Sequence, residues 1–279
     1  RQRAAGLANA FIQEGKKDKA IKTIDKILEV TPQYNVPYDV TIHDFYYICP
    51  RINLYMPEVG YCGIPNTVTC NACLSVPPIV VDPPNRNIQW WRGKMNGLLA
   101  GACNIYAPSL WASSEIKKVY PLLDITVIPH EQNISVTGLK KSTSIRVAIL
   151  GVLADVKGQK IIKEMIGLIS TLGLPIEIVL IGHSLDLIPA SSVFFQTGQY
   201  KDDDLDSLIN KISPDLFLFP GVVPETYSFT LSKAMRTGLP IMASSLGAIP
   251  ERLQKYSKVY LYAQGSTAVE ILEMIKTSV

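Results

Sequence analysis

Apolar runs of strand length alternate with amphipathic stretches through the second half of the chain. Buried strands are predicted at residues 146–150, 176–181, 193–196, 216–219 and 241–243. Helices are predicted at residues 158–172, 203–212, 227–237 and 268–276. Continuously apolar strands between amphipathic helices indicate a parallel sheet that is covered on both faces. Ligands of such sheets bind outside the carboxyl ends of the strands.

The preceding part of the chain, residues 35–139, shows a shorter version of this alternation. Strands are predicted at residues 38–42, 104–107 and 125–128, and helices at residues 90–102 and 109–119. Ser109 stands where the second of these helices needs a cap. A polar linker at residues 140–143 then leads into residues 144–279. We therefore expect two α/β domains.

The first 34 residues are predicted to form a pair of helices. Gly15 stands at a turn and Pro32 at a stop. The segment resembles a tetratricopeptide repeat through Ala8, Phe11, Gly15, Ala20, Ile24 and Pro32. One repeat cannot bury its own hydrophobic face, so the resemblance implies further repeats upstream or packing on the next domain, and it implies a surface for a protein partner. An ordinary helical hairpin is the alternative.

Composition narrows the classes of function. The 279 residues are 47% hydrophobic and 18% charged, and 27 Lys and Arg against 24 Asp and Glu leave a formal charge of +3. That charge is too weak for a protein that binds nucleic acid. The longest apolar runs are far shorter than the roughly 20 residues that cross a bilayer. We therefore expect a soluble protein. The five cysteines, four of them between Cys49 and Cys73, do not suggest a disulfide-stapled secreted scaffold, so we expect a cytoplasmic setting, and peripheral association with the inner membrane stays open.

A candidate anion site follows the predicted strand at residues 146–150. The strand ends in Gly151, and the next loop carries Lys157 and Gly158 into a helix. Glycine lets the backbone approach a ligand closely, lysine offers a charge to a phosphate, and the helix N-terminus adds exposed N–H donors. A solvated turn is the simpler alternative.

A second candidate site follows the predicted strand at residues 216–219. The loop at residues 220–228 presents Glu225 before a helix. The stretch from Glu225 to Pro240 resembles the signature of the family-four retaining GT-B glycosyltransferases, in which two glutamates stand eight positions apart. In that family the first glutamate contacts the donor sugar and the second contacts the ribose. Glu225 matches the first, and stabilisation of a helix N-terminus by its charge is the alternative.

The position of the second glutamate is occupied by Lys233. A lysine has hydrogen-bond donors only, so it cannot accept a bond from ribose hydroxyls. Either Lys233 reaches the diphosphate in an altered site, or the domain is a weakened relative. Lys157 matches the family's phosphate-binding lysine, whereas Val152 and Leu153 stand in the region where an arginine is common.

The resemblance covers residues 145–279 and includes Gly182-His183, Gly198-Gln199-Tyr200 and the motif that begins at Gly247. Residues 37–138 resemble part of the acceptor-side domain in a bacterial polysaccharide subgroup, through residues 38–44, 48–53 and 127–131. These resemblances imply an α/β fold with GT-B-type Rossmann-like domains. The C-terminal domain would be complete and the N-terminal domain partial, behind the helical hairpin.

The activity implied by this family is transfer of a hexose or deoxyhexose, with retention, from a nucleoside diphosphate sugar to a glycan or lipid-linked glycan. No cofactor is implied for the chemistry. The implied donor-binding residues are Gly151, Lys157, Gly158, Gly182, Glu225, Thr226, Tyr227, Ser228 and Lys233. A degenerate transferase domain that acts as a binding or scaffold protein is the alternative from another class. A nucleotide-sugar epimerase shares the fold but not the signature.

Cysteines form a further candidate site between residues 49 and 74. The four residues are Cys49, Cys62, Cys70 and Cys73. Four thiolates can hold a structural zinc ion or an iron–sulfur cluster, and the final C-x2-C spacing suits a chelate. Buried free thiols and disulfides are the alternatives. His43, next to Asp44 at a predicted strand end, is a candidate catalytic or acceptor-binding residue, and a structural role for it stays open.

Overall fold

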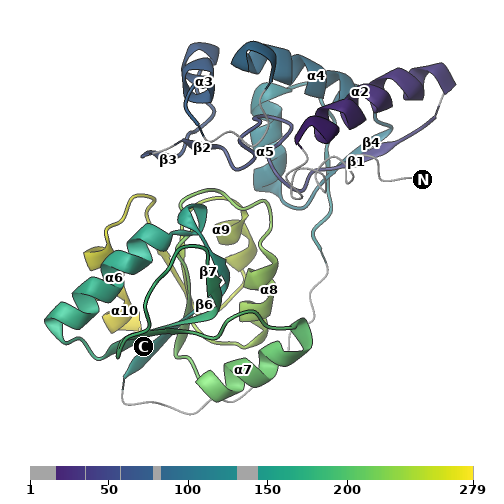
Figure 1. Ribbon diagram of the computed structural model, residues 1–279. Helices are drawn as coiled ribbons and strands as arrows, with labels where there is room; N and C mark the ends of the chain where they lie inside the picture. The colour runs from purple at the N-terminus through teal and green to yellow at the C-terminus, as the bar shows by residue number, and fades with distance from the viewer. Residues whose placement is uncertain (1–16, 35, 57, 78–82, 131–143, 279) are drawn as a thin grey trace. The chain divides into compact units, whose positions relative to one another are not determined.

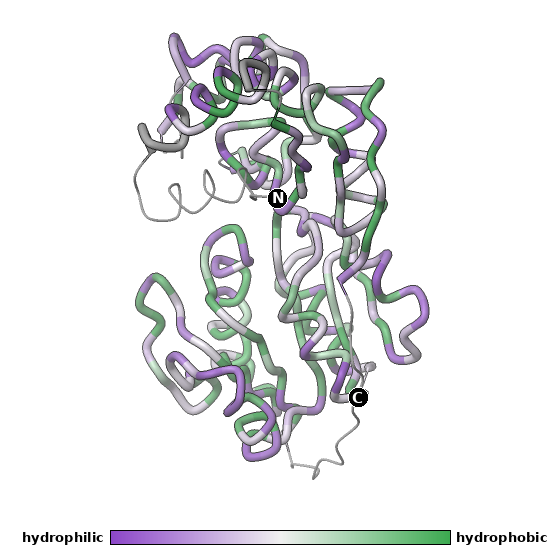
Figure 2. Tube along the Cα trace, turned by 90° about the vertical axis from the view of Figure 1, so that its right-hand side faces the viewer, coloured by the Kyte–Doolittle hydropathy of each residue, from purple (hydrophilic) through white to green (hydrophobic). Residues whose placement is uncertain are grey.

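A computed structural model describes residues 17–34, 36–56, 58–77, 83–130 and 144–278. The chain folds into two compact units. The first unit runs up to His130 and also includes the segment Pro224–Tyr227, and the second contains the rest. In Figure 2, hydrophobic and hydrophilic residues alternate along the trace of each unit. No helix in the described ranges is long and apolar enough to span a bilayer.

The first unit contains a three-stranded parallel sheet with the order β1-β4-β5. Its strands are β1 (Asp39–Thr41), β4 (Asn104–Ala107) and β5 (Thr126–Val127), and a small antiparallel hairpin is formed by β2 (Tyr55–Met56) and β3 (Gly60–Tyr61). Its helices are α2 (Lys17–Tyr34), α3 (Thr67–Leu74), η1 (Pro84–Arg86), α4 (Ile88–Ala100) and α5 (Leu110–Val119). The alternation predicted for this part of the chain is confirmed.

Local sequence signals fix two of these elements. Strand β4 covers the predicted residues, and the hydroxyl of Ser109 caps α5 by accepting a hydrogen bond from the N–H of Ala112 at 3.1 Å. The core beneath them is aromatic. The indole of Trp91 meets the ring of Tyr46 edge-on at 4.7 Å and donates to the Tyr46 carbonyl at 2.8 Å. Burial of these large rings fastens α4 to the segment that follows β1.

The N-terminal helical pair can be tested only for its second helix, because residues 1–16 lie outside the described residues. Helix α2 places Ile24 in the core of the first unit and packs against α4, where Leu28 lies close to Gly97. Packing on the next domain, one of the two arrangements expected, is therefore seen for this helix. The stop expected at Pro32 is wrong, because α2 continues to Tyr34.

The second unit is built on a six-stranded parallel sheet with the order β11-β10-β9-β6-β7-β8. Its strands are β6 (Ile145–Leu153), β7 (Ile176–Ser184), β8 (Phe194–Gln196), β9 (Leu216–Phe219), β10 (Ile241–Ser244) and β11 (Val259–Tyr262). Its helices are η2 (Asp155–Lys157), α6 (Gln159–Leu172), η3 (Asp202–Asp204), α7 (Leu205–Ile212), α8 (Phe229–Arg236), α9 (Ala248–Leu253) and α10 (Ala268–Ser278). The predicted parallel sheet is confirmed.

Side chains alternate between two hydrophobic cores along the central strand β6. Val147 and Ile149 face the core that α6 and α10 cover, whereas Ala148 and Leu150 face the core that α7, α8 and α9 cover. Figure 1 shows α6 and α10 on one side of the strands and α8 and α9 on the other. Burial on both faces explains why the strand is apolar without interruption.

The order of the strands creates a switch point. From β6 the chain moves outward through β7 to β8, and it then returns to the other side of β6 as β9 and continues outward to β11. The connections at the carboxyl ends of β6 and β9 therefore lead to opposite faces of the sheet. A crevice forms at such a point, and it is where open α/β sheets bind ligands.

Candidate functional site

The carboxyl ends of β6 and β9 form the candidate site of the second unit. There, two glycines allow the neighbouring strands β6 and β7 to approach each other closely. Gly151 and Gly182 are partners in the β6–β7 register and have φ angles of 97° and 143°. A Cβ on Gly182 would lie 1.8 Å from the carbonyl oxygen of Gly151, and one on Gly151 would lie 3.3 Å from the Thr230 methyl. A side chain at position 182 is therefore excluded, and one at position 151 would be crowded.

The turn before α6 lies against the turn after β9. The N–H of Val222 donates to the carbonyl of Val156 at 3.1 Å. Gly158 adopts a φ of 83°, and a Cβ there would lie 2.0 Å from the Pro220 carbonyl oxygen. Lys157 precedes this glycine and is half-buried. Two segments more than sixty positions apart in the sequence thus pack into one compact surface at the carboxyl ends of the strands, which we call the floor of the site. The predicted Gly151, Lys157, Gly158 and Gly182 all belong to it.

Two helices begin at this floor. Helix α6 starts after Gly158, which has no side chain to serve as a cap, and α8 starts after Ser228. The side chain of Ser228 makes no capping hydrogen bond to α8, and its hydroxyl lies 3.2 Å from that of Thr230. Helix N-termini carry partial positive charge, and Lys157 adds a full one. The floor therefore suits an anion.

The start of α8 differs from the prediction. The helix begins at Phe229 and not at residue 227, because Ser228 adopts a φ of 71° that the helix cannot continue. Arg252 holds this junction, since its guanidinium donates to the Ser228 carbonyl at 2.6 Å and to the Ser232 hydroxyl at 2.8 Å. Sequence reasoning missed Arg252, although it directly follows the motif that begins at Gly247.

Lys233 lies on α8 and is paired with an acidic residue. Its ammonium is 2.5 Å from Oδ1 of Asp202 and 5.9 Å from the centre of the Tyr200 ring. Asp202 is mostly exposed, whereas the side chain of Lys233 is 22% exposed. The lysine therefore brings a carboxylate to the side of α8 on which residue 233 lies. Sequence reasoning missed Asp202, and its only signal was the run of three aspartates.

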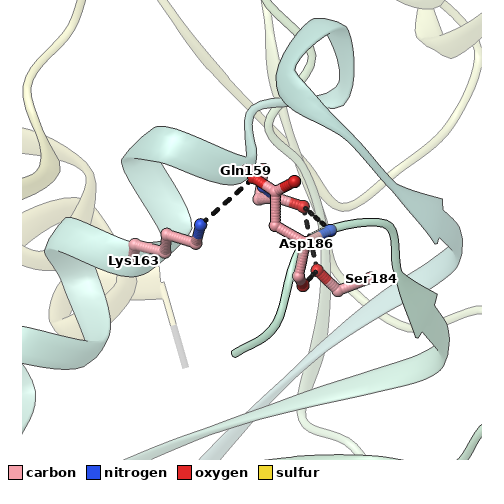
Figure 3. Close-up of polar contacts among 4 residues, drawn as sticks. All are labelled: Gln159, Lys163, Ser184 and Asp186. Carbon is pink, nitrogen blue, oxygen red and sulfur yellow. Dashed lines mark hydrogen bonds and ion pairs between the residues drawn. The ribbon is translucent and has the colours of Figure 1, made fainter. Parts of the chain in front are cut away.

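A polar network ties the loop after β7 to the first turn of α6 (Figure 3). The buried Gln159 donates to the Asp186 carboxylate at 2.6 Å and accepts from the Ser184 hydroxyl at 2.8 Å. Lys163 also reaches the Asp186 carboxylate, at 3.4 Å. This network fixes the loop beside the N-terminus of α6. The sequence predicted the helix that carries Gln159 and Lys163, but it singled out none of the four residues as part of a site.

The segment Pro224–Tyr227 packs as part of the first unit. The hydroxyl of Thr226 donates to the His43 carbonyl at 2.6 Å, and the carbonyl of Thr226 accepts from Ser109 at 2.8 Å. Tyr227 is buried and donates to the His130 carbonyl at 3.0 Å. These bonds anchor the two residues that directly follow the half-buried Glu225.

His43 and Asp44 follow β1, as expected from the sequence. His43 is exposed, and its neighbour Asp44 accepts a hydrogen bond from the N–H of Tyr46 at 2.9 Å. Desolvation raises the pKa of Asp44 to about 6, and the Tyr46 hydrogen bond opposes this shift only in part. The carboxyl end of β1 therefore carries an exposed imidazole beside a carboxyl group that titrates in the weakly acidic range.

The cysteines stay free thiols. None of the five, all of which lie in the described part of the chain, forms a disulfide. Within the described ranges, no group of three or more His, Cys, Asp or Glu side chains is arranged to hold a metal ion. Burial raises the pKa of the Cys49 thiol to about 12, and it also raises those of Cys62 and Cys70.

A hollow of about 550 Å³ in the first unit lies elsewhere. It is lined by residues around the start of β4 and the end of α5, such as Asn104, Tyr120 and Leu122. This is the amino end of β4, opposite to the edge where parallel sheets bind their ligands. We therefore do not assign it to the candidate site.

The strand order and the position of the candidate site together define the fold class of the chain. The chain has the α/β fold of the GT-B glycosyltransferases, with a Rossmann-like second unit, as the sequence predicted. No protein-family model matches the sequence. No curated protein matches it either.

Two solved glycosyltransferase structures illustrate the similarity in fold. HepE of Anabaena, in complex with UDP-glucose, has a TM-score of 0.59 and 15% identity, over 92% of this chain and 66% of HepE. Sucrose-phosphate synthase of Thermosynechococcus elongatus has a TM-score of 0.63 and 12% identity, over 94% of this chain and 70% of that enzyme. The chain thus spans slightly less than two thirds of HepE. At these identities the likeness establishes the fold.

Proposed function

We propose that the chain is a glycosyltransferase that takes its sugar from a nucleoside diphosphate donor and transfers it to a glycan or lipid-linked glycan. One observation carries this proposal: the N-termini of α6 and α8 start at the same glycine-tight floor, beside Lys157. A diphosphate is the anion that such a site suits, because it carries charge on both sides of a bridging oxygen. The fold shared with a UDP-glucose complex supports the choice.

The residues divide the chemistry between them. In our proposal Lys157 and the N–H groups at the starts of α6 and α8 stabilise charge on the departing diphosphate while the bond between it and the sugar C1 breaks. Glu225 orients the sugar, as its match to the first family glutamate implies. The acceptor hydroxyl bonds to C1 with retention and loses its proton, for which His43 is the proposed acceptor. No cofactor takes part.

Lys233 has a specific place in this proposal. Because it holds Asp202 at 2.5 Å, the carboxylate that accepts from the ribose hydroxyls would come from Asp202 instead of residue 233. One oxygen of the carboxylate faces the ammonium, and the other can accept from a ribose hydroxyl. The presence of lysine instead of glutamate at position 233 then changes which residue accepts from the ribose, and the site keeps its ability to bind the nucleotide.

Calorimetric titration with UDP, GDP and dTDP tests the donor site. We expect one of the three to bind the full chain in the micromolar range. Lys157→Ala should weaken that binding by about 10- to 100-fold, since a charge-assisted bond contributes roughly 1.5–3 kcal/mol. Lys160→Ala is the matched control, because Lys160 is exposed on α6, the helix that follows Lys157, and its loss should leave binding unchanged.

The same experiment can contradict the proposal. If no nucleotide binds at millimolar concentration, the floor is not a donor site, and a binding or scaffold role replaces the enzyme. If a nucleotide binds equally well to Lys157→Ala, the site lies elsewhere. Release of nucleoside diphosphate from the matching sugar nucleotide, with a glycan acceptor present, then tests turnover.

A further inference from the structure

Two hydrogen bonds connect α9 to the start of α8, and both come from one arginine. Arg252 donates from Nη1 to the Ser228 carbonyl at 2.6 Å and from Nη2 to the Ser232 hydroxyl at 2.8 Å. Ser228 directly precedes α8, and Ser232 lies four positions later, one turn into the helix. The guanidinium therefore joins the residue before the helix to its first turn.

Ser228 needs such support because its backbone is strained. It has φ 71° and ψ 91°, and this ψ lies outside the range of about 30–60° that the left-handed region allows. Among the residues of the second unit that the structure describes, Ser213 is the other non-glycine residue with positive φ, and it stands at the C-terminus of α7, where that conformation is common. A strained residue persists only where its surroundings enforce it. The bond from Arg252 to the Ser228 carbonyl is such a constraint.

The arginine acts from a firmly packed helix. Helix α9 is held by Ile249 and Leu253, which are buried in the same core as Leu231 of α8. Both helices thus cover the same face of the sheet (Figure 1), and the half-buried Arg252 lies between packed elements. A constraint that comes from a packed helix holds its target more precisely than one that comes from a loop.

The first turn of α8 borders the proposed diphosphate site. The methyl group of Thr230 lies 3.3 Å from where a Cβ on Gly151 would stand, at the end of β6. The Ser228 side chain makes no capping hydrogen bond to the helix. A capping side chain would compete with an anion for the N–H groups of this turn. At α8 the cap residue does not compete in this way.

The charge of Arg252 also favours a bound anion. Helix N-termini carry partial positive charge, so a cation beside one is unfavourable for the helix alone. A bound anion reverses the sign of that contribution, because it interacts favourably with both the helix end and the guanidinium. The position of Arg252 is therefore better explained by an anion site than by the stability of α8.

We propose that Arg252 is a positioning residue for the diphosphate of the donor. It holds Ser228 in its strained conformation, and so it keeps the backbone N–H groups of the first turn of α8 directed at the anion. Arg252 acts through this turn and is not itself a ligand. This inference rests on the function proposed above, and it adds the residue that keeps the anion site in shape.

Calorimetric titration of the full chain with inorganic pyrophosphate and with UDP, GDP and dTDP tests this role. Arg252→Ala should weaken the binding of pyrophosphate and of the preferred nucleotide by the same factor, about 10-fold or more, because the lost constraint acts on the shared diphosphate. Arg236→Ala is the matched control, since Arg236 lies in the last turn of α8, 3.6 Å from Asp206. Helix-end effects fall off within one turn, so this control should change pyrophosphate binding by less than about twofold.

The outcomes separate this role from the donor site itself. If the wild type binds neither pyrophosphate nor any of the nucleotides at millimolar concentration, the donor site fails, and this inference fails with it. If the wild type binds and Arg252→Ala binds equally well, only the role of Arg252 is overturned. Full recovery of affinity in Arg252→Lys would also overturn it, because a lysine keeps the charge but lacks the planar fork that bridges two acceptors.

A milder variant gives the test without depending on how Arg252→Ala folds. Ser232→Ala removes one acceptor of the guanidinium, and alanine is the strongest helix former. We expect it to weaken pyrophosphate binding by about 2- to 10-fold and to add no further loss to Arg252→Ala, because both substitutions break the same bridge. Unchanged affinity in Ser232→Ala, or additive losses in the double variant, would overturn the proposal.

Discussion

The ammonium of Lys233 lies 2.5 Å from the carboxylate of Asp202, and this pair links α8 to the short helix η3. The aspartate presents a hydrogen-bond acceptor, with a positive charge behind it. An exposed pair of this kind contributes at most about 1 kcal/mol to stability. The pair is therefore more informative about ligands than about folding.

The pair leads to the first prediction. Asp202→Asn should weaken nucleotide binding by about 5- to 30-fold, because a charged acceptor for ribose hydroxyls is lost. Lys233→Glu alone should not strengthen binding, because the new carboxylate would repel Asp202. Calorimetry measures both, with Asp203→Asn as the control in the same short helix. Strong improvement by Lys233→Glu would show that residue 233 itself faces the ribose.

The two glycines that bracket α6 give a matched pair for the second prediction. Both adopt positive φ, but a Cβ on Gly158 would meet the Pro220 carbonyl oxygen at 2.0 Å, whereas one on Gly173 would meet nothing within 4 Å. Gly173→Ala should cost about 1–2 kcal/mol from backbone strain. Gly158→Ala should cost at least about 3 kcal/mol and abolish nucleotide binding. Denaturant unfolding and calorimetry check this, and equal costs would mean that the turn relaxes freely.

Glu225 provides a third prediction that separates sugar contact from nucleotide contact. Glu225→Gln should leave the affinity for the free nucleoside diphosphate within about twofold and lower turnover by about 100-fold or more, because the lost interaction acts on the sugar. Product release from the sugar nucleotide gives the rate. Glu164→Gln, on the exposed face of α6, is the control. A large loss of affinity for the free nucleotide would assign Glu225 a different partner.

Asp44 predicts a pH dependence of stability. Its pKa rises from 3.8 to about 6 on folding, so the folded state binds a proton that the unfolded state releases between these values. The stability that this proton contributes is present below pH 4 and is lost as the pH rises through 6. Asp44→Asn should therefore gain about 1–3 kcal/mol over the wild type between pH 4 and pH 7.

Chemical unfolding at several pH values measures this difference. Asp124→Asn is the control, because Asp124 is an exposed carboxylate of the same unit. Parallel pH profiles for Asp44→Asn and the wild type would mean that Asp44 is solvated in the folded protein.

Local signals explain what the sequence predicted well. Strand β9 was placed at the residues it occupies because four apolar residues in a row stand between Asp215 and the turn that begins at Pro220. Helix α9 was missed because it has six residues with Pro250 among them, and a helix this short shows no periodicity. Helix α3 was missed because its apolar and polar residues are not separated onto different sides, which leaves no amphipathic face to detect.

The site was harder to predict than the fold, for a physical reason. Lys157 and Gly158 could be singled out because their chemistry is local. The approach of Gly158 to Pro220 and the pairing of Lys233 with Asp202 depend on which strands are neighbours, and strand order is not encoded in any short stretch. Pairs that the tertiary fold brings together are invisible to periodicity.

The central place of β6 has a consequence during synthesis. The ribosome releases β6 first among the strands of its sheet, but its second neighbour, β9, emerges only after α6, β7, β8 and α7. Until then one edge of an apolar strand has unpaired N–H and C=O groups, and such edges pair readily with other chains. The nascent second unit therefore passes through an aggregation-prone interval that ends when β9 docks, and chaperone binding in that interval would protect the edge.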